Sequence, residues 1–416
     1  MSQQIQSKEV YSRLRWRLTL FMVLAATGSV LAQDLLSPAP PDPLTPAVLR
    51  DKDQVPPLSQ PPSLPETPFR IGPLALRPNV SYGYRSVEGL PTRDGRRIAS
   101  EIHSVNATLS ADIGEHWTLA YLPSWMYYTA RAMEDSFDQA AHLSGALVFG
   151  EWGFQIAEDY SQATPTLVET GQQTKQETWS TSLSTSYRFT PNLELQVSAG
   201  VNERYTDIAN DIRTWNSTAG FNLFISPRLN INLGTSFGYT EVVAGPDMSS
   251  ESYNARFNWL PTEKLTIGIG TGMQYSHSNS SAGLDLSTPL LNFTFGYRPF
   301  ETTTLNLSLS QTVSPSYFRD QVTKNFRWSV SANQRLLGRF YLTLSYAPYD
   351  TTYAATTSLV DAGRKDSVDS YSAGLTAQLF ERLSVSASFS QTDNKSNRGD
   401  FNFSTKQMGL QFQYAY

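Results

Sequence analysis

The chain has 416 residues, of which 40% are apolar and only 17% are charged, and its mean hydropathy is slightly negative, so apolar and polar residues must be finely interleaved. It contains no cysteine, which excludes disulfides, thiolate metal sites and a cysteine nucleophile. The net charge of −5 argues against nucleic acid as a partner, because nucleic-acid binding proteins usually carry a basic surface.

The first 32 residues predict a secretory signal peptide. Arg13, Arg15 and Arg17 precede an apolar run over residues 18–26, and small residues then lead to a cleavage site after Ala32. A membrane-anchoring helix is the alternative, but it needs about 20 apolar residues, roughly twice this run. The segment carries a net charge of +3, so the exported chain would carry −8.

Residues 33–70 predict a proline-rich periplasmic linker that is disordered. The stretch from Pro38 to Pro68 holds 11 of the 24 prolines of the chain. This composition favours an extended spacer, partly polyproline II, over a packed core. The alternative is a recognition segment for a periplasmic partner, such as a component of an export system.

Residues 71–416 predict one domain built from a repeated hairpin. Strand-like segments with apolar residues at every second position recur 35 to 41 residues apart, and turn signals precede them, most of which contain Gly or Pro. They begin at Trp117, Trp152, Leu193, Leu229, Leu265, Leu305, Leu342 and Leu383. Nine hairpins give an all-β fold, a transmembrane antiparallel up-and-down β-barrel of about eighteen strands, within a range of 16–18.

The two faces of these strands favour a membrane barrel over a soluble sheet. One face is Leu, Ile, Val, Phe and Tyr, whereas the other is small and neutral, as in the series Ser384, Ser386, Ser388 and Ser390. A soluble sandwich or propeller alternates too, but it would need protected edges. In a bilayer the barrel must close, with apolar side chains facing lipid and polar side chains facing the lumen.

The connections predict an orientation. Both ends of the barrel and its short turns should be periplasmic, and the longer connections should face outside. Several of these connections are acidic, and their residues include Asp247, Asp361, Asp366 and Asp369. We expect solvated loop charges there, with divalent-cation bridging to outer-leaflet lipid as the alternative.

The last ten residues form an alternating strand with an aromatic end, in which the apolar positions are Met408, Leu410, Phe412, Tyr414 and Tyr416. Together with the signal sequence and the repeated strands, this end resembles bacterial outer-membrane β-barrel proteins. The resemblance implies an integral outer-membrane location, outer-membrane lipid as a partner, and a terminal strand read by the barrel-assembly machinery. Within that group, the short loops are most similar to β-barrel porins often linked with exopolysaccharide export.

An enzymatic site is not expected. His142 and Ser144 lie two residues apart on one strand face, as a base and its nucleophile could. The alternate residues of this strand, such as Leu143 and Leu147, are apolar and should face lipid, so His142 and Ser144 should both point into the lumen. The sequence has no phosphate-binding glycine loop and no histidine spacing typical of zinc sites, so we expect neither a cofactor nor a metal.

Arginines on the polar phase are the candidates for selectivity. Some lie a few residues from a periplasmic turn and could form a basic ring that selects anionic solute or polymer. The alternative is that they pair with Glu194, Glu263, Glu301 and Glu381 near the same rim. The candidates are Arg188, Arg256, Arg298, Arg327 and Arg335.

The function predicted from these features is a non-enzymatic outer-membrane channel for solutes or polymer. One alternative is an exopolysaccharide export conduit that uses a periplasmic partner. A further alternative is a structural or adhesive barrel with a plugged lumen.

Overall fold

The computed structural model describes residues 69–416 except for short stretches at 93–95, 168–171, 208–210, 244–245, 280–284, 317–320 and 356–362. The predicted signal peptide, all of the predicted linker up to residue 68, and Asp361 lie outside the described residues. The first described strand, β1 (Phe69–Ile71), is short and pairs only with β2.

The described chain is a single barrel wall. Twenty strands belong to one sheet. Of these, β1 is too short to cross the membrane, and β18 and β19 are two halves of one crossing strand. Eighteen strands therefore cross, as predicted. They are β2 (Leu74–Pro91), β3 (Arg97–Ile113), β4 (Trp117–Tyr128), β5 (Ser136–Phe149), β6 (Trp152–Ala163), β9 (Gln176–Thr190), β10 (Leu193–Thr206), β11 (Ile212–Ser226), β12 (Leu229–Val242), β13 (Met248–Thr262), β14 (Leu265–Ser278), β15 (Leu286–Phe300), β16 (Thr303–Pro315), β17 (Gln321–Leu336), β18 (Phe340–Tyr346) with β19 (Tyr349–Ala355), β20 (Lys365–Phe380), β21 (Leu383–Ser396) and β22 (Phe403–Ala415).

The remaining described elements are small. Strands β7 (Thr166–Leu167) and β8 (Gln172–Gln173) pair only with each other, and a 3-10 turn, η1 (Gly399–Phe401), precedes the last strand. Among the described residues, no helix is both long and apolar enough to cross a membrane.

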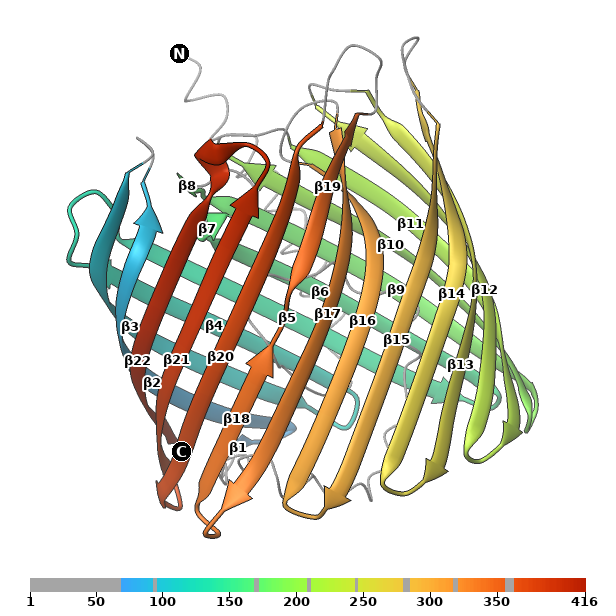
Figure 1. Ribbon diagram of the computed structural model, residues 1–416. Coiled ribbons are helices and arrows are strands. Elements are labelled where there is room, and N and C mark those ends of the chain that lie inside the picture. Colours follow the sequence, from blue (N-terminus) through green and yellow to red (C-terminus); the bar gives the residue numbers. More distant parts are fainter. Residues whose placement is uncertain are drawn as a thin grey trace, which may run out of the picture.

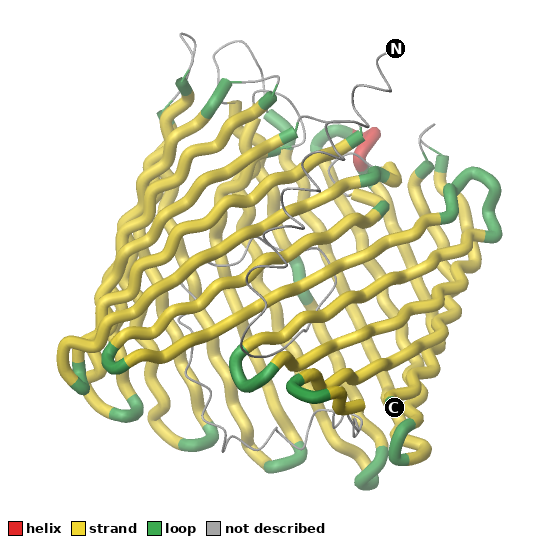
Figure 2. Tube along the Cα trace, turned by 180° about the vertical axis from the view of Figure 1, so that it is seen from behind, coloured by secondary structure: helices red, strands yellow, loops and turns green. Residues whose placement is uncertain are grey.

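The barrel closes between its first and last crossing strands. β2 pairs antiparallel with β22, from Asn79 opposite Ala415 to Glu88 opposite Lys406. The blue and red strands therefore lie side by side in Figure 1, and the wall is continuous when seen from behind in Figure 2. Closure leaves no unpaired sheet edge, which is the condition for crossing a bilayer with strands.

The strand register separates an apolar from a polar face. Residues directly opposite one another share a face of the sheet. Ile231 on β12 lies opposite Phe257 on β13, which lies opposite Ile269 on β14, whereas the next positions along, Asn232 and Arg256, form a polar row. The apolar face is the exterior, because a barrel of this size has a hydrated lumen and lipid around it. The exposed large hydrophobic side chains of the strands, such as Leu233 with 57% of its surface accessible, are thus covered by the membrane.

Tight turns join the strands at one end, at the eight places predicted from the sequence. Gly114, Gly150 and Gly338 have φ between 59° and 75°, a conformation that favours glycine. Pro261 and Pro299 do not form the turns themselves. Each lies at a register shift just before its turn, where proline needs no ladder partner. Tyr416 lies at the same end (Figure 1), so we take this end as periplasmic.

Proline also explains the one interrupted crossing strand. β18 and β19 keep the same register against β17 and β20, so no residue is inserted between them. Pro348 accepts a bond from Trp328 N at 3.2 Å, and Ala347 N donates to Ser370 O at 2.8 Å. Pro348 has no N–H to donate to the ladder at this point, and the alternation of faces continues through the gap.

In the last strand the apolar side chains, at every second position, face lipid, as expected. Met408, Leu410, Phe412 and Tyr414 are all exposed on the outer face. The ring of Tyr416 stacks on Phe69, with centroids 4.4 Å apart, and the guanidinium of Arg382 lies 4.9 Å from the ring centroid. The end of the chain is therefore held in place by packing, while its role as an assembly signal stays a prediction.

Candidate functional site

The lumen wall consists mainly of small neutral polar side chains. Many of them hydrogen-bond directly to the neighbouring strand, at oxygen–oxygen distances of 2.7 to 3.0 Å. Such pairs are Thr218 with Ser236, Ser308 with Ser329, and Thr376 with Ser386. Because these side chains are short, they cover the wall without filling a barrel of this strand number.

The three arginines predicted near the periplasmic rim lie on the lumen phase of β9, β15 and β17. A terminal nitrogen of Arg188 is 3.7 Å from Glu194, so this arginine forms the ion pair of the alternative prediction. Arg335 instead donates to the carbonyl of Gly338 at 2.9 and 3.0 Å. Arg298 is exposed at the end of β15.

The rim arginines do not form a contiguous ring. Six strand steps separate β9 from β15, which at about 4.8 Å per step is roughly 29 Å along the wall. Glu263, one of the expected partners, lies 4.0 Å from Arg228 and not next to any of the five candidates. The rim therefore presents separate charges, of which Arg188 is neutralised by its partner.

The two deeper arginines, Arg256 and Arg327, lie in one register row. From Arg256 the row runs across the neighbouring strands through Gly270, Asn292 and Ser310 to Arg327. Four strand steps separate the two arginines, roughly 19 Å along the hydrogen-bonding direction. The guanidinium of Arg327 lies 4.9 Å from the ring centroid of Tyr349, which continues the same row on β19.

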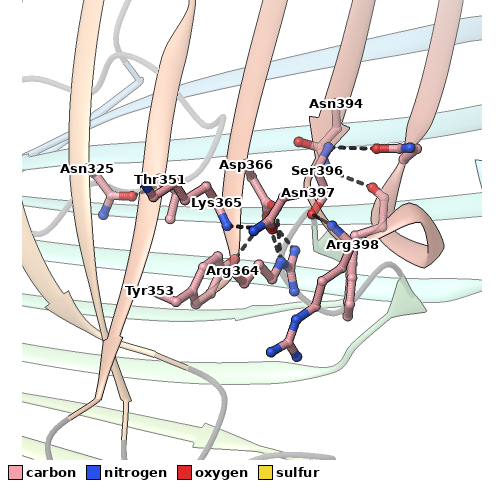
Figure 3. A network of polar contacts seen from close by, with 12 residues as sticks. Asn325, Thr351, Tyr353, Arg364, Lys365, Asp366, Asn394, Ser396, Asn397 and Arg398 are labelled. Carbon is pink, nitrogen blue, oxygen red and sulfur yellow. Dashed lines mark hydrogen bonds and ion pairs between the residues drawn. The ribbon is translucent and has the colours of Figure 1, made fainter. Parts of the chain in front are cut away.

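A buried ion pair at the long-loop end was not predicted (Figure 3). Arg364 donates through Nε to both carboxylate oxygens of Asp366, at 2.9 and 3.0 Å, and the two side chains are only 4% and 1% exposed. The guanidinium lies 3.5 Å from the ring centroid of Phe401 in η1 and 4.5 Å from that of Tyr353 on β19. The expectation of a solvated loop charge at Asp366 was therefore wrong, because the carboxylate lies on the lumen phase and is paired.

Further hydrogen bonds extend this pair into a network that we call the mouth latch, made of Tyr353, Arg364, Asp366, Asn394, Asn397 and Phe401. Asn394 Nδ2 donates to Phe401 O at 2.6 Å, and Asn397 accepts from Lys365 N at 2.8 Å. The latch ties β19, β20 and β21 to the turn that precedes β22 (Figure 3). A signal was present in the sequence, since Arg364 and Asp366 are two apart and so share a strand face.

The other acidic connections also have partners. Asp369 accepts from the hydroxyl of Tyr346 at 2.8 Å on the outer face, and Asp247 accepts from the hydroxyl of Tyr239 at 2.8 Å. Hydroxyl–carboxylate pairs of this kind suit the membrane interface, where aromatic side chains have one apolar and one wet end.

His142 lies on the lumen phase of β5 as predicted, with a partner that the sequence did not indicate. Its Nδ1 is 2.6 Å from Asp159 Oδ1 on β6. In the part of the chain that the structure describes, no hydrogen bond joins Ser144 to His142, and no three His, Asp or Glu side chains are grouped to hold a metal ion. The His–Asp pair is thus not joined to a nucleophile.

Comparison with known proteins gives structural likenesses only. No protein-family model and no curated protein matches the sequence. OccK2 (OpdF) of Pseudomonas aeruginosa is 13% identical, with a TM-score of 0.47 over 82% of this chain and 98% of that chain. OccAB3 of Acinetobacter baumannii is 10% identical, with a TM-score of 0.44 over 82% and 99% of the two chains. The siderophore receptor PirA of the same organism is 6% identical, with a TM-score of 0.44 over 82% and 80%.

Proposed function

We propose that the barrel is a water-filled channel that passes small solutes across the outer membrane. The observation that carries this proposal is the composition of the lumen wall, in which short hydroxyl and amide side chains line eighteen strands. A barrel of eight strands is filled by its own side chains, whereas one of 16 to 18 strands leaves an aqueous channel. A wall of this kind offers hydrogen bonds to water along its length and does not exclude it.

The channel should prefer anions. Among the described ion pairs of the lumen wall, carboxylates neutralise Arg77, Arg188 and Arg364, but no described ion pair includes Arg298, Arg327 or Arg335. Fixed positive charge on a pore wall raises the local concentration of anions and lowers that of cations.

Recording from the purified full chain in a planar lipid bilayer tests the proposal. We expect discrete conductance steps, and in a salt gradient a reversal potential on the anion-selective side. The variant R298Q/R327Q/R335Q should keep the steps and move the reversal potential toward the cation-selective side. A protein that inserts without conductance steps would contradict the open channel and support the structural or adhesive barrel.

The export conduit stays a prediction. It depends on residues 38–68, which lie outside the described residues. A chain that lacks this segment and still conducts, in cells that no longer secrete polymer, would favour export over diffusion.

A further inference from the structure

The lumen wall holds a titratable pair that lies open to the pore. His142 on β5 and Asp159 on β6 are directly opposite one another, and Nδ1 of the imidazole is 2.6 Å from a carboxylate oxygen. The two side chains are 30% and 56% exposed, so water and ions in the lumen can reach both groups. The pair therefore differs from Arg364 and Asp366, which are buried.

The hydrogen bond within the pair leaves the ring able to take up a second proton. A carboxylate can only accept, so Nδ1 donates to Asp159 and Nε2 is left as an acceptor. Among the described hydrogen bonds, the one to Asp159 is the only bond of this ring. A proton can thus bind at Nε2 while the bond to Asp159 persists, and the carboxylate stabilises the imidazolium that forms.

Few other charges lie near the pair among the described residues. On β4 the lumen positions from Thr118 to Met126 are uncharged, and on β9 those from Thr178 to Ser186 are serine or threonine. On β5 itself, Asp138 is four residues away, about 13 Å along the strand, and its carboxylate accepts from Thr164 N at 3.1 Å. Arg204 lies two strands from β6, on β10. A proton on the imidazole therefore changes the local charge of the wall by one unit.

The pair faces the arginines of the opposite wall. Nine strand steps separate β6 from β17 in either direction around the eighteen crossing strands, so the two strands lie across the lumen from one another (Figure 1). On its lumen face β17 carries Arg335 and the exposed Arg327. An ion in the pore therefore passes between a basic wall and a wall whose charge depends on one histidine.

The state of this histidine should change the ion preference of the pore. Between about pH 5 and pH 8, histidine is the side chain whose charge ordinarily changes. While the imidazole is neutral, the carboxylate of Asp159 attracts cations and opposes the effect of the arginines, whereas an imidazolium cancels that charge. We propose that His142 is a proton-dependent selectivity residue, which lowers the anion preference of the channel at neutral pH and restores it in acid.

The inference rests on the proposed channel function, and one recording distinguishes the two. The reversal potential of the purified full chain in a planar bilayer is measured in a potassium chloride gradient at about pH 7.5 and about pH 5.5, on either side of the ordinary histidine titration. In water, the energy of an ion about 8 Å from a unit charge is close to the thermal energy. We therefore expect acidification to raise the anion-to-cation permeability ratio of the wild type about twofold.

Variants of the pair should fix its charge. H142Q should hold the permeability ratio near its neutral-pH value under both conditions. D159N should already give, at neutral pH, the ratio that the wild type reaches in acid, a gain that loss of structure would not produce. H277Q is the matched control, because His277 on the outer face of β14 pairs with Asp285 through the same ring nitrogen, and this variant should respond to pH like the wild type.

The outcomes separate the inference from the channel. A wild type whose permeability ratio does not change with pH would overturn the inference while leaving an anion-selective channel. A rise on acidification that persists in H142Q, or one that H277Q abolishes, would do the same. A wild type that inserts without conductance steps would contradict the channel itself, and the inference with it.

Discussion

The mouth latch gives a prediction whose size can be derived from the structure. Arg364 and Asp366 are almost fully buried, so replacing Arg364 with methionine leaves a buried carboxylate without its counter-ion. Removing one partner of such a pair typically costs about 3–5 kcal/mol. At about 1.4 kcal/mol per factor of ten, local opening should become roughly a hundredfold to a few thousandfold more frequent.

Hydrogen exchange measured by mass spectrometry on the intact protein can read this change. Tyr353 N donates to Arg364 O at 3.0 Å, and Asn397 N donates to Lys365 O at 3.0 Å, so peptides that cover 349–355 and 396–402 should lose protection. Peptides from strands on the far side of the barrel, such as β11, should not change.

Two further variants control the comparison. R398M removes an exposed arginine of the connection between β21 and β22, which the latch also includes, and should exchange like the wild type. The double variant R364M/D366L removes both charges and should recover much of the protection, because a buried pair can be replaced by apolar groups at little cost. If these peptides exchanged in R364M at rates within about threefold of those in R398M, the reasoning would be refuted.

Three other predictions concern the wall. L233R, on the lipid face, should lower the free energy of unfolding measured in urea titrations by about 2–4 kcal/mol, whereas S236R, on the lumen face, should lower it far less. Equal losses of stability would contradict the assignment of faces. Replacing Gly145 with valine should reduce folding yield, because a Cβ there would lie 2.6 Å from the ring of Trp117, while G296V, where nothing is closer than 3.7 Å, should be tolerated. Truncating Tyr416 to alanine should slow assembly of the heat-modifiable form, since the ring is held between Phe69 and Arg382; unchanged assembly would remove this residue from the predicted signal.

The strand pattern made the architecture predictable. Alternation is a local property, so each hairpin could be recognised from its own residues, and the turns at Gly114, Gly150 and Gly338 follow from the need for positive φ. The number of strands and the pairing of the first with the last follow once every hairpin is recognised, because a sheet without edges must close.

The arrangement of side chains across the wall was not predictable in the same way. The row that joins Arg256 to Arg327 depends on the register of five strands, and each register depends on turns and bulges such as the one before Thr262. Small uncertainties in each turn accumulate from strand to strand, so the sequence places an arginine on the correct face without placing it beside its neighbours.

Loop residues were the other source of error. Asp366 was expected in solvent because it follows a connection rich in charged and small residues, but its side chain packs into the lumen against Arg364. The contact with Phe401 joins two connections that are separated by a whole hairpin, and this kind of long-range contact has no local signature.

The central claim is that one face of each strand lines a hydrated pore and the other faces lipid. Because the chain has no cysteine, single cysteines at Ser308 and at its neighbour Leu307 can be labelled without background. The measurement is single-channel conductance before and after a charged, water-soluble methanethiosulfonate reagent. We expect a lower conductance for S308C and no change for L307C, whereas equal responses, or no conductance in either variant, would contradict the account.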